Sequence, residues 1–262
     1  MAGFLLINPR SGKGSPTADE LASEAEALGV EARILHERED PAALARSADA
    51  DALGIAGGDG SLAAVAEVAL ERDVPFVCIP FGTRNHFARD LGLDRDDPLD
   101  ALRAFGGVER RIDVGRADER LFLNNVSLGV YARLVHRRER HRRRRETFAR
   151  VRAWAIVITH REPLGITIDG TKVEARLVLV ANNEYVLDFP SIGERERLDE
   201  GRLHLYVPGN EPPERTGERF VVDAKAGELE AAVDGEPDVL KMPVEFRVEP
   251  RALRVLVPPE RD

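Results

Sequence analysis

The sequence has a single cysteine among its 262 residues, Cys78, which lies in an apolar run between Val77 and Ile79. One cysteine cannot form an intrachain disulfide, so a disulfide-stapled fold is excluded and a reducing cytoplasm is the expected location. The six histidines are scattered, with no paired cysteines and no second histidine four residues on, which argues against a zinc site.

Long hydrophobic runs are missing as well. No apolar stretch approaches the roughly 20 residues that a membrane-spanning helix needs. The N-terminal run at residues 4–7 is too short for the core of a signal peptide. With 43% hydrophobic and 32% charged residues, the composition predicts a soluble globular protein with one large or two small domains.

Charge is distributed unevenly along the chain. The formal net charge is −9, yet residues 133–152 contain ten arginines and two glutamates, a local charge of +8. The rest of the chain therefore carries −17. A short cationic segment on an acidic body indicates an anionic partner that the average charge conceals.

The first half of the chain alternates short apolar runs with helical patterns. Strands that alternate with helices at this spacing build a parallel sheet covered on both faces. The expected strands lie near residues 4–8, 31–36, 53–56 and 76–79, and the expected helices over 16–28, 41–48 and 61–70.

The second half has runs of strands and one expected helix, at residues 146–159. Asp169-Gly170 between apolar runs predicts a two-residue hairpin. Strands without intervening helices are typical of an antiparallel sandwich or barrel. We therefore predict a Rossmann-like α/β nucleotide-binding domain at residues 1–123, followed by an antiparallel β-sandwich domain at residues 124–262.

A glycine-rich loop, Gly57-Gly58-Asp59-Gly60-Ser61, lies between an expected strand and an expected helix. Glycines let the backbone approach a ligand, and the next helix presents N–H groups and its positive dipole end, so the loop is typical of a phosphate site. A carboxylate beside phosphates needs a cation between them, so Asp59 indicates Mg²⁺ bound with a nucleotide. The alternative is a plain turn in which Asp59 caps the helix.

Two more polar loops follow the first and fourth expected strands, which end at the same edge of the sheet. Neither loop fits the Walker pattern. Each loop alone resembles an ordinary turn, but three loops in corresponding positions would surround one nucleotide. The first contains Asn8, Ser11 and Gly12, and the second contains Gly82, Thr83 and Asn85.

These loops, in this order, resemble the diacylglycerol kinase catalytic-domain family, which includes bacterial lipid kinases and sphingosine kinases. NAD kinases and phosphofructokinases share the Gly-Gly-Asp-Gly turn, while the stretch at residues 82–88 favours the lipid kinase branch. The resemblance implies an ATP-binding α/β domain and a β-sandwich domain. The matching motifs are Asn8-Pro9-Arg10-Ser11-Gly12, residues 57–61, residues 80–85 with Phe87-Ala88-Arg89, residues 124–129, and Asp234-Gly235-Glu236-Pro237.

The resemblance also implies roles for single residues. Asp59 would organise Mg²⁺–ATP, and Asp234 would be the general base that takes the proton from the substrate hydroxyl, assisted by Glu236. From the residues alone, Asp234-Gly235 is as readily a two-residue hairpin turn. The residues expected to line the nucleotide site are Asn8, Ser11, Gly57, Gly58, Gly60, Ser61, Gly82, Thr83 and Asn85.

Two departures from the family fall in the second half. Members have a glycine-rich stretch after the strand that ends here at residues 182–183, whereas residues 185–189 of this chain contain no glycine. Many bacterial members have an Asp-Asp-Gly that helps to hold a structural Mg²⁺, and this chain has Asp199-Glu200-Gly201. Asp199 and Glu200 are therefore candidate ligands of a structural Mg²⁺ with altered geometry.

Together these motifs predict an ATP- and Mg²⁺-dependent lipid kinase that phosphorylates diacylglycerol or a related lipid alcohol. One alternative is a kinase of the same fold that acts on a non-lipid hydroxyl. The other is a degenerate member that binds nucleotide and membrane without turnover. We expect a cytoplasmic protein with peripheral membrane association, and a homodimer is compatible with this expectation.

The arginine-rich segment then acquires an interpretation. Each Lys or Arg near an anionic leaflet is worth roughly 1 kcal/mol, so Arg142, Arg143, Arg144 and Arg145 are predicted to contact an anionic membrane surface. The segment lacks interleaved aromatic residues, so we expect no nucleic-acid partner. The alternative is a solvated loop with no partner.

Overall fold

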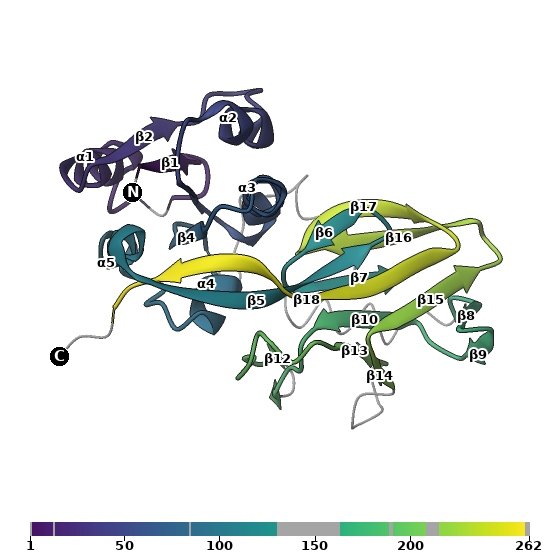
Figure 1. Cartoon of the computed structure of the whole chain (residues 1–262). Helices are drawn as coiled ribbons and strands as arrows, with labels where there is room; N and C mark the ends of the chain where they lie inside the picture. Colours follow the sequence, from purple (N-terminus) through teal and green to yellow (C-terminus); the bar gives the residue numbers. More distant parts are fainter. Residues whose placement is uncertain are drawn as a thin grey trace. The chain divides into compact units, whose positions relative to one another are not determined.

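Figure 1 shows the computed structural model of the chain, which describes residues 2–12, 14–83, 85–129, 163–188, 191–207 and 215–259. The chain divides into two units: unit 1 comprises residues 1–114, 185–200 and 250–262, and unit 2 comprises residues 115–184 and 201–249. This division differs from the predicted single boundary near Asn124, because the chain crosses between the units after residues 114, 184, 200 and 249.

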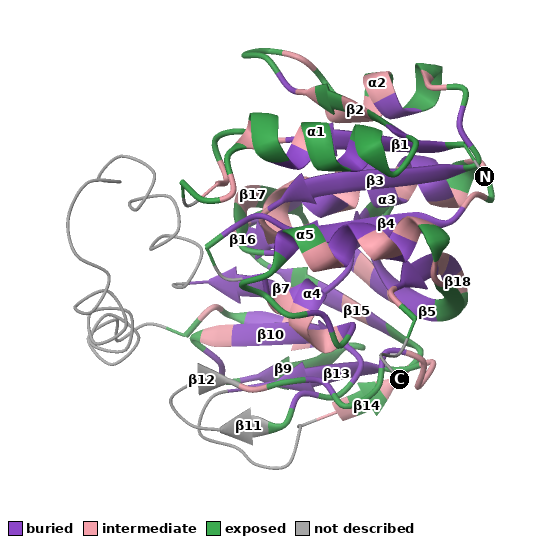
Figure 2. Ribbon diagram, turned by 90° about the vertical axis from the view of Figure 1, so that its left-hand side faces the viewer, coloured by how far each residue is buried: buried purple, intermediate pink, exposed green. Residues whose placement is uncertain are grey.

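Unit 1 is built on a parallel sheet with the strand order β2-β1-β3-β4-β18. Strands β1, β3 and β4 are buried along their whole length, and Figure 2 shows them in purple beside helices with green outer faces. The predicted α/β architecture is therefore confirmed. The elements are β1 (Gly3–Ile7), α1 (Ala18–Ala27), β2 (Val30–Ile34), α2 (Pro41–Ser47), β3 (Ala52–Gly57), α3 (Asp59–Glu71), β4 (Phe76–Pro80), α4 (His86–Asp90), α5 (Pro98–Ala101), the 3₁₀ helix η1 (Leu102–Gly106), β5 (Val108–Ala117), β11 (Leu187–Asp188) and β12 (Ser191–Ile192).

Helix α1 begins after Thr17 rather than at Ser15-Pro16, where the sequence pattern placed its start. The Thr17 hydroxyl accepts the Glu20 N–H at 3.1 Å, and the Glu20 carboxylate accepts the Thr17 N–H at 2.7 Å. This reciprocal capping box satisfies two N–H groups at the start of the helix.

Unit 2 is a sandwich of two antiparallel layers, as predicted. One layer has the order β14-β13-β10-β7-β16-β17, and the other contains β9, β8, β15 and the first part of β18. Side chains of both layers form one core, in which the rings of Phe122 and Phe246 meet edge to face at 6.5 Å. The elements are β6 (Arg120–Phe122), β7 (Asn125–Gly129), β8 (Ile166–Ile168), β9 (Thr171–Val173), β10 (Leu177–Asn182), β13 (Leu203–Tyr206), β14 (Arg215–Gly217), β15 (Arg219–Ala224), β16 (Glu228–Val233), β17 (Glu236–Lys241) and β18 (Val244–Val257).

Strand β18 is one continuous strand of 14 residues that belongs to both units. Its first part pairs antiparallel with β15 in unit 2, and residues 255–256 pair parallel with β4 in unit 1. Pro250 and Arg251, the latter at φ 50°, interrupt the apolar alternation at its middle. Proline is typical of turns, and so Pro250 concealed the continuity of the strand.

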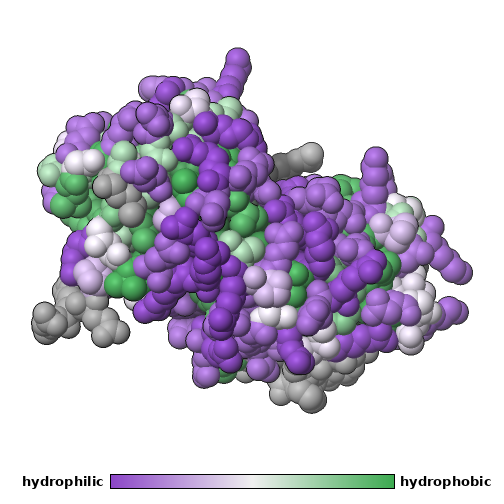
Figure 3. All heavy atoms as spheres, in the orientation of Figure 1, coloured by the Kyte–Doolittle hydropathy of each residue, from purple (hydrophilic) through white to green (hydrophobic). Residues whose placement is uncertain are grey.

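The surface of the described residues is largely polar. Figure 3 shows hydrophilic side chains over most of the face in view. No helix among these residues is long and apolar enough to span a membrane. Two features predicted from the sequence lie wholly outside the described part of the chain. They are the helix at residues 146–159 and the cationic segment at residues 133–152.

Candidate active site

The loops that follow β1, β3 and β4 touch one another at one edge of the parallel sheet. A Cβ on Gly82 would lie 2.4 Å from the Cα of Gly58, and a Cβ on Gly12 would lie 2.8 Å from the Phe81 ring. The Phe81 N–H also donates to the Gly57 carbonyl at 3.3 Å. The fold therefore brings together the three loops that the sequence predicts around a nucleotide, and it does so through backbone contacts that only glycine allows.

The glycine-rich loop leads directly into α3. Gly58 is the N-cap residue and provides no side chain to cap the helix. The Ser61 hydroxyl donates to the Gly58 carbonyl at 2.8 Å, which folds the loop back on itself. Gly58, Asp59, Gly60 and Ser61 are all partly exposed. A first helical turn without a side-chain cap and open to solvent is suited to binding an anion.

Asp59 joins this loop to the short helix α4. Its Oδ2 accepts the His86 N–H at 3.2 Å, and its Oδ1 accepts the Phe87 N–H at 3.1 Å. Asp59 thus caps α4, whereas the sequence alternative had it capping the helix that follows its own loop. A carboxylate offers about four acceptor positions, so each oxygen can accept further bonds. The residues present therefore fit a Mg²⁺–nucleotide complex at this loop.

Asn85 shapes its loop from within. It lies in the left-handed region at φ 49° and is buried. Its Oδ1 accepts the Gly82 N–H at 2.8 Å, and its Nδ2 donates to the carbonyls of Gly82 and Arg95 at 3.0 and 3.2 Å. Its amide is thus used by the protein itself, while Thr83 of the same loop is exposed.

Asn8 shapes the loop after β1 in a similar way. Its Oδ1 accepts the Arg10 N–H at 3.1 Å, and its carbonyl accepts the Ser11 N–H at 3.1 Å. Asn8 and Ser11 are partly exposed. Both residues therefore lie at the edge where the three loops meet, as the sequence predicts.

Asp234 lies in unit 2, in the two-residue turn between β16 and β17. Asp234 and Gly235 have φ of 47° and 85°, as a type I′ hairpin turn requires. The Asp234 carboxylate is only 7% exposed. Its Oδ2 accepts the Leu123 N–H at 2.8 Å, and its Oδ1 accepts the N–H groups of Asn124 and Asn125 at 2.7 and 3.1 Å. Asp234 therefore forms the turn and also holds the start of β7.

Asp169-Gly170 offers an internal comparison. It forms the predicted hairpin between β8 and β9, with φ of 49° and 76°. The Asp169 side chain is 46% exposed and accepts the Val221 N–H at 2.8 Å. A turn of this type does not need a buried carboxylate, so the burial of Asp234 is a separate feature of the site.

Buried amides surround Asp234, and the sequence analysis assigned them no role. Asn124, Asn182 and Asn183 are all buried. The Asn182 N–H donates to the Asn124 carbonyl at 3.0 Å, and its Nδ2 donates to the Leu123 carbonyl at 3.2 Å. The available signal was the recurrence of Asn-Asn at residues 124–125 and 182–183.

Two further sets of predicted site residues are Glu236 and the arginines at residues 142–145. Glu236 is the first residue of β17 and is exposed. Arg142–Arg145 lie outside the described residues.

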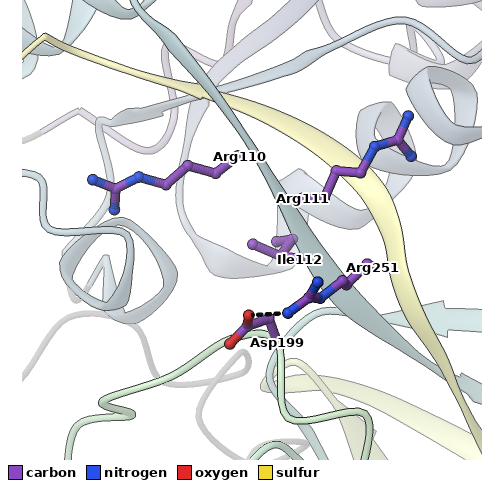
Figure 4. A pocket seen from close by; sticks show the side chains of 5 residues that line it. All are labelled: Arg110, Arg111, Ile112, Asp199 and Arg251. Carbon is purple, nitrogen blue, oxygen red and sulfur yellow. Dashed lines mark hydrogen bonds and ion pairs between the residues drawn. The ribbon is translucent and has the colours of Figure 1, made fainter.

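Asp199, a predicted Mg²⁺ ligand, is held by two arginines. Its Oδ1 accepts bonds from the Arg197 Nε and Nη2 at 3.1 and 3.0 Å, and its Oδ2 accepts one from the Arg251 Nη2 at 2.9 Å. Figure 4 shows the Arg251 guanidinium pointing at Asp199 beside a cavity of about 470 Å³ that Arg110, Arg111 and Ile112 also line. No group of three or more potential metal-binding side chains gathers in the described ranges. Guanidinium groups at both oxygens do not fit a cation site, so we derive no role for a metal at Asp199 and Glu200.

Part of the chain is similar in sequence to known proteins. Residues 2–117 match the family model described as the diacylglycerol kinase catalytic domain. The chain is 36% identical over 89 residues to a diacylglycerol kinase of Bacillus subtilis, covering 33% of this chain and 29% of the relative. It is 27% identical over 191 residues to a diacylglycerol kinase of Mycobacterium tuberculosis, covering 64% and 59%. These matches span about a third to three-fifths of the relatives' lengths.

Two further similarities extend the comparison. A Chromohalobacter salexigens protein named "Probable lipid kinase YegS-like" is 31% identical over 145 residues, covering 51% of this chain and 45% of the relative. The crystal structure of a diacylglycerol kinase from Bacillus anthracis superposes with a TM-score of 0.73 at 19% identity, over 98% of this chain and 96% of the other. This last likeness shows the two-part fold.

We expect the Asp199→Asn variant to be less stable than the wild type at pH 7 by less than about 1 kcal/mol, the scale of partly exposed ion pairs. The hydrogen bonds from Arg197, and then those from Arg251, lower the pKa of Asp199. A lowered pKa stabilises the folded state above the unfolded-state pKa of about 3.9, and this contribution is lost as the pH falls through the folded-state pKa. Urea unfolding should therefore show a difference that shrinks below about pH 4.

The control is Glu31→Gln, which changes an exposed carboxylate on β2. The unfolding curve of the wild type in Mg²⁺ should coincide with its unfolding curve in EDTA. A Mg²⁺-dependent rise in stability that Asp199→Asn removes would contradict the arginine-held arrangement.

Proposed function

We propose that the chain is an ATP- and Mg²⁺-dependent lipid kinase, since residues 2–117 match the family model of the diacylglycerol kinase catalytic domain. Its acceptor would be the hydroxyl of diacylglycerol or of a related lipid alcohol. The names of the relatives, two diacylglycerol kinases and a lipid kinase, support a lipid acceptor.

The observation that carries the proposal is the arrangement of Asp59. A carboxylate at the start of an uncapped helical turn is fixed by two backbone N–H groups from the start of α4. Phosphoryl transfer asks the protein mainly for positioning and for neutralisation of charge. The backbone N–H groups of Gly58 and Gly60 would bind phosphate oxygens, and Asp59 would face the cation that accompanies them. Mg²⁺, when bound with the nucleotide, would neutralise charge on the transferred phosphoryl group.

The proton of the acceptor hydroxyl needs a base, and Asp234 with Glu236 is the proposed pair. Three backbone N–H groups hold Asp234 in one orientation, whereas Glu236 is exposed. Substitution of Asp234 therefore changes the turn as well as the base. Substitution of Glu236 affects a side chain at the surface of β17.

We expect Asp59→Asn to lower the rate of phosphoryl transfer by about 100- to 1000-fold, the usual cost of removing one preorganised electrostatic group. The amide keeps an oxygen that can accept a bond from α4, so folding should be retained. The assay is transfer from labelled ATP with Mg²⁺ to a panel of lipid alcohols. Asp49→Asn, an exposed carboxylate of unit 1, is the control.

The outcomes of this assay separate the candidates. Transfer by the wild type to none of the lipids would overturn the lipid kinase proposal, and transfer to a soluble alcohol alone would favour the non-lipid kinase. Nucleotide binding without any transfer would favour the degenerate member. Full activity of Asp59→Asn would remove Asp59 from the mechanism.

Glu236→Gln and Asp234→Asn should each lower kcat by about 100- to 10,000-fold if both carboxylates take part in proton transfer. Thermal unfolding distinguishes the two residues. Asp234→Asn should also lower Tm, because the amide can no longer accept all three backbone bonds. Glu236→Gln should have the same Tm as the wild type. A variant that keeps the full rate excludes its residue from proton transfer.

We also propose that the arginine-rich segment attracts the protein to anionic membranes. Replacing Arg142, Arg143, Arg144 and Arg145 together with glutamine removes four charges, each worth roughly 1 kcal/mol near an anionic leaflet. Flotation with phosphatidylglycerol vesicles at low salt should recover the wild type and far less of the variant. Neutral phosphatidylcholine vesicles and high salt are the controls, and equal flotation on both lipids would assign the segment to a solvated loop.

A further inference from the structure

One short segment of the second half of the chain belongs to unit 1. Residues 185–200 are part of this unit, although the chain on either side of them belongs to unit 2. This segment contains the stretch that departs from the family pattern. Among the contacts that join it to unit 1 is a buried ion-pair cluster on α4.

Arg195 and Asp90 form the centre of this cluster. Both side chains are 0% exposed, and the Arg195 Nε donates to the Asp90 Oδ2 at 2.7 Å. The Arg195 guanidinium also lies over the Tyr185 ring, 5.4 Å from its centroid. On the other side, the Arg89 Nη2 donates to the Asp90 Oδ1 at 2.8 Å and to the Gly193 carbonyl at 2.9 Å. Two consecutive residues of α4 are thus bonded to the segment.

Helix α4 connects this cluster to the candidate active site. It contains only residues 86–90, so its two ends cannot move independently. Asp90 is its last residue, and the N–H groups of His86 and Phe87 at its start are the two donors to Asp59. Phe87 is itself fully buried, with its ring 6.4 Å from that of Phe76. A shift of α4 would therefore move both donors relative to the Asp59 carboxylate.

We propose that Asp90 and Arg195 are positioning residues, which hold α4 so that its N-terminus orients Asp59 toward the nucleotide. The functional part of this inference rests on the proposed kinase activity. A buried ion pair adds little net stability compared with well-packed apolar residues, so stability alone does not account for this pair. Its directional bonds supply the fixed geometry that a site for phosphoryl transfer needs.

The test uses the full chain with the double substitution Asp90→Asn and Arg195→Met, which removes both charges together. A single substitution would leave a buried charge without its partner and could prevent folding. Arg195→Lys is the conservative variant, because it keeps the charge and loses the planar guanidinium. The matched control is Arg197→Gln, two residues along the same segment, where the side chain is 60% exposed.

The first measurement is hydrogen exchange at the His86 and Phe87 amides, with the amides of β1 as the reference. In the double variant we expect these two amides to exchange at least tenfold faster, while β1 exchanges as in the wild type. Arg197→Gln should leave all of them unchanged. Unchanged exchange at His86 and Phe87 would overturn the positioning role, whether or not the protein is a kinase.

The second measurement is Mg²⁺–ATP affinity by calorimetry, together with KM for ATP and for the lipid. The double variant should bind nucleotide at least tenfold more weakly and keep its KM for the lipid, and Arg195→Lys should lie in between. A wild type that binds Mg²⁺–ATP but phosphorylates no lipid contradicts only the proposed function. Equal affinity in the wild type and a folded double variant contradicts only the positioning role.

Discussion

Two hydrogen bonds from the start of α4 to the Asp59 carboxylate hold together the loops on which the candidate site depends. They require α4 to lie against the glycine-rich loop, and this in turn requires Gly82 and Gly58 to meet with no side chain between them. Asn85 completes the arrangement by bonding both backbone groups of Gly82. The glycines therefore serve packing between loops as much as access for a ligand.

Three of the carboxylates singled out from the sequence are each held by a different set of donors. Asp59 accepts N–H groups at a helix start, Asp234 accepts three N–H groups beside a hairpin turn, and Asp199 is held by two guanidinium groups. The first two arrangements keep an anion in place without cancelling its charge, which suits a functional carboxylate. The third neutralises the carboxylate, and so it serves the structure.

The regular parts of the fold could be predicted from local pattern. The four N-terminal strands, the helices between them and the Asp169-Gly170 hairpin follow from apolar periodicity and turn chemistry, which depend on neighbouring residues alone. The division into units could not be predicted in this way. Residues 185–200 join unit 1 through long-range contacts, such as that between Arg195 and Asp90, which are 105 residues apart in sequence. The continuity of β18 could not be predicted either, because Pro250 interrupts its apolar alternation and its partners, β15 and β4, belong to different units.

The sequence by itself determined the loops, their order and the residue types of the candidate site, because glycines, caps and carboxylates act through chemistry that a motif displays. Only the tertiary structure decided what each carboxylate bonds to. Asp59 caps α4 rather than its own helix, Asp234 is buried where Asp169 is exposed, and Asp199 faces arginines where a cation was predicted. The physical reason is that a carboxylate takes whichever donors the folded chain brings within about 3 Å, and those donors come from distant segments.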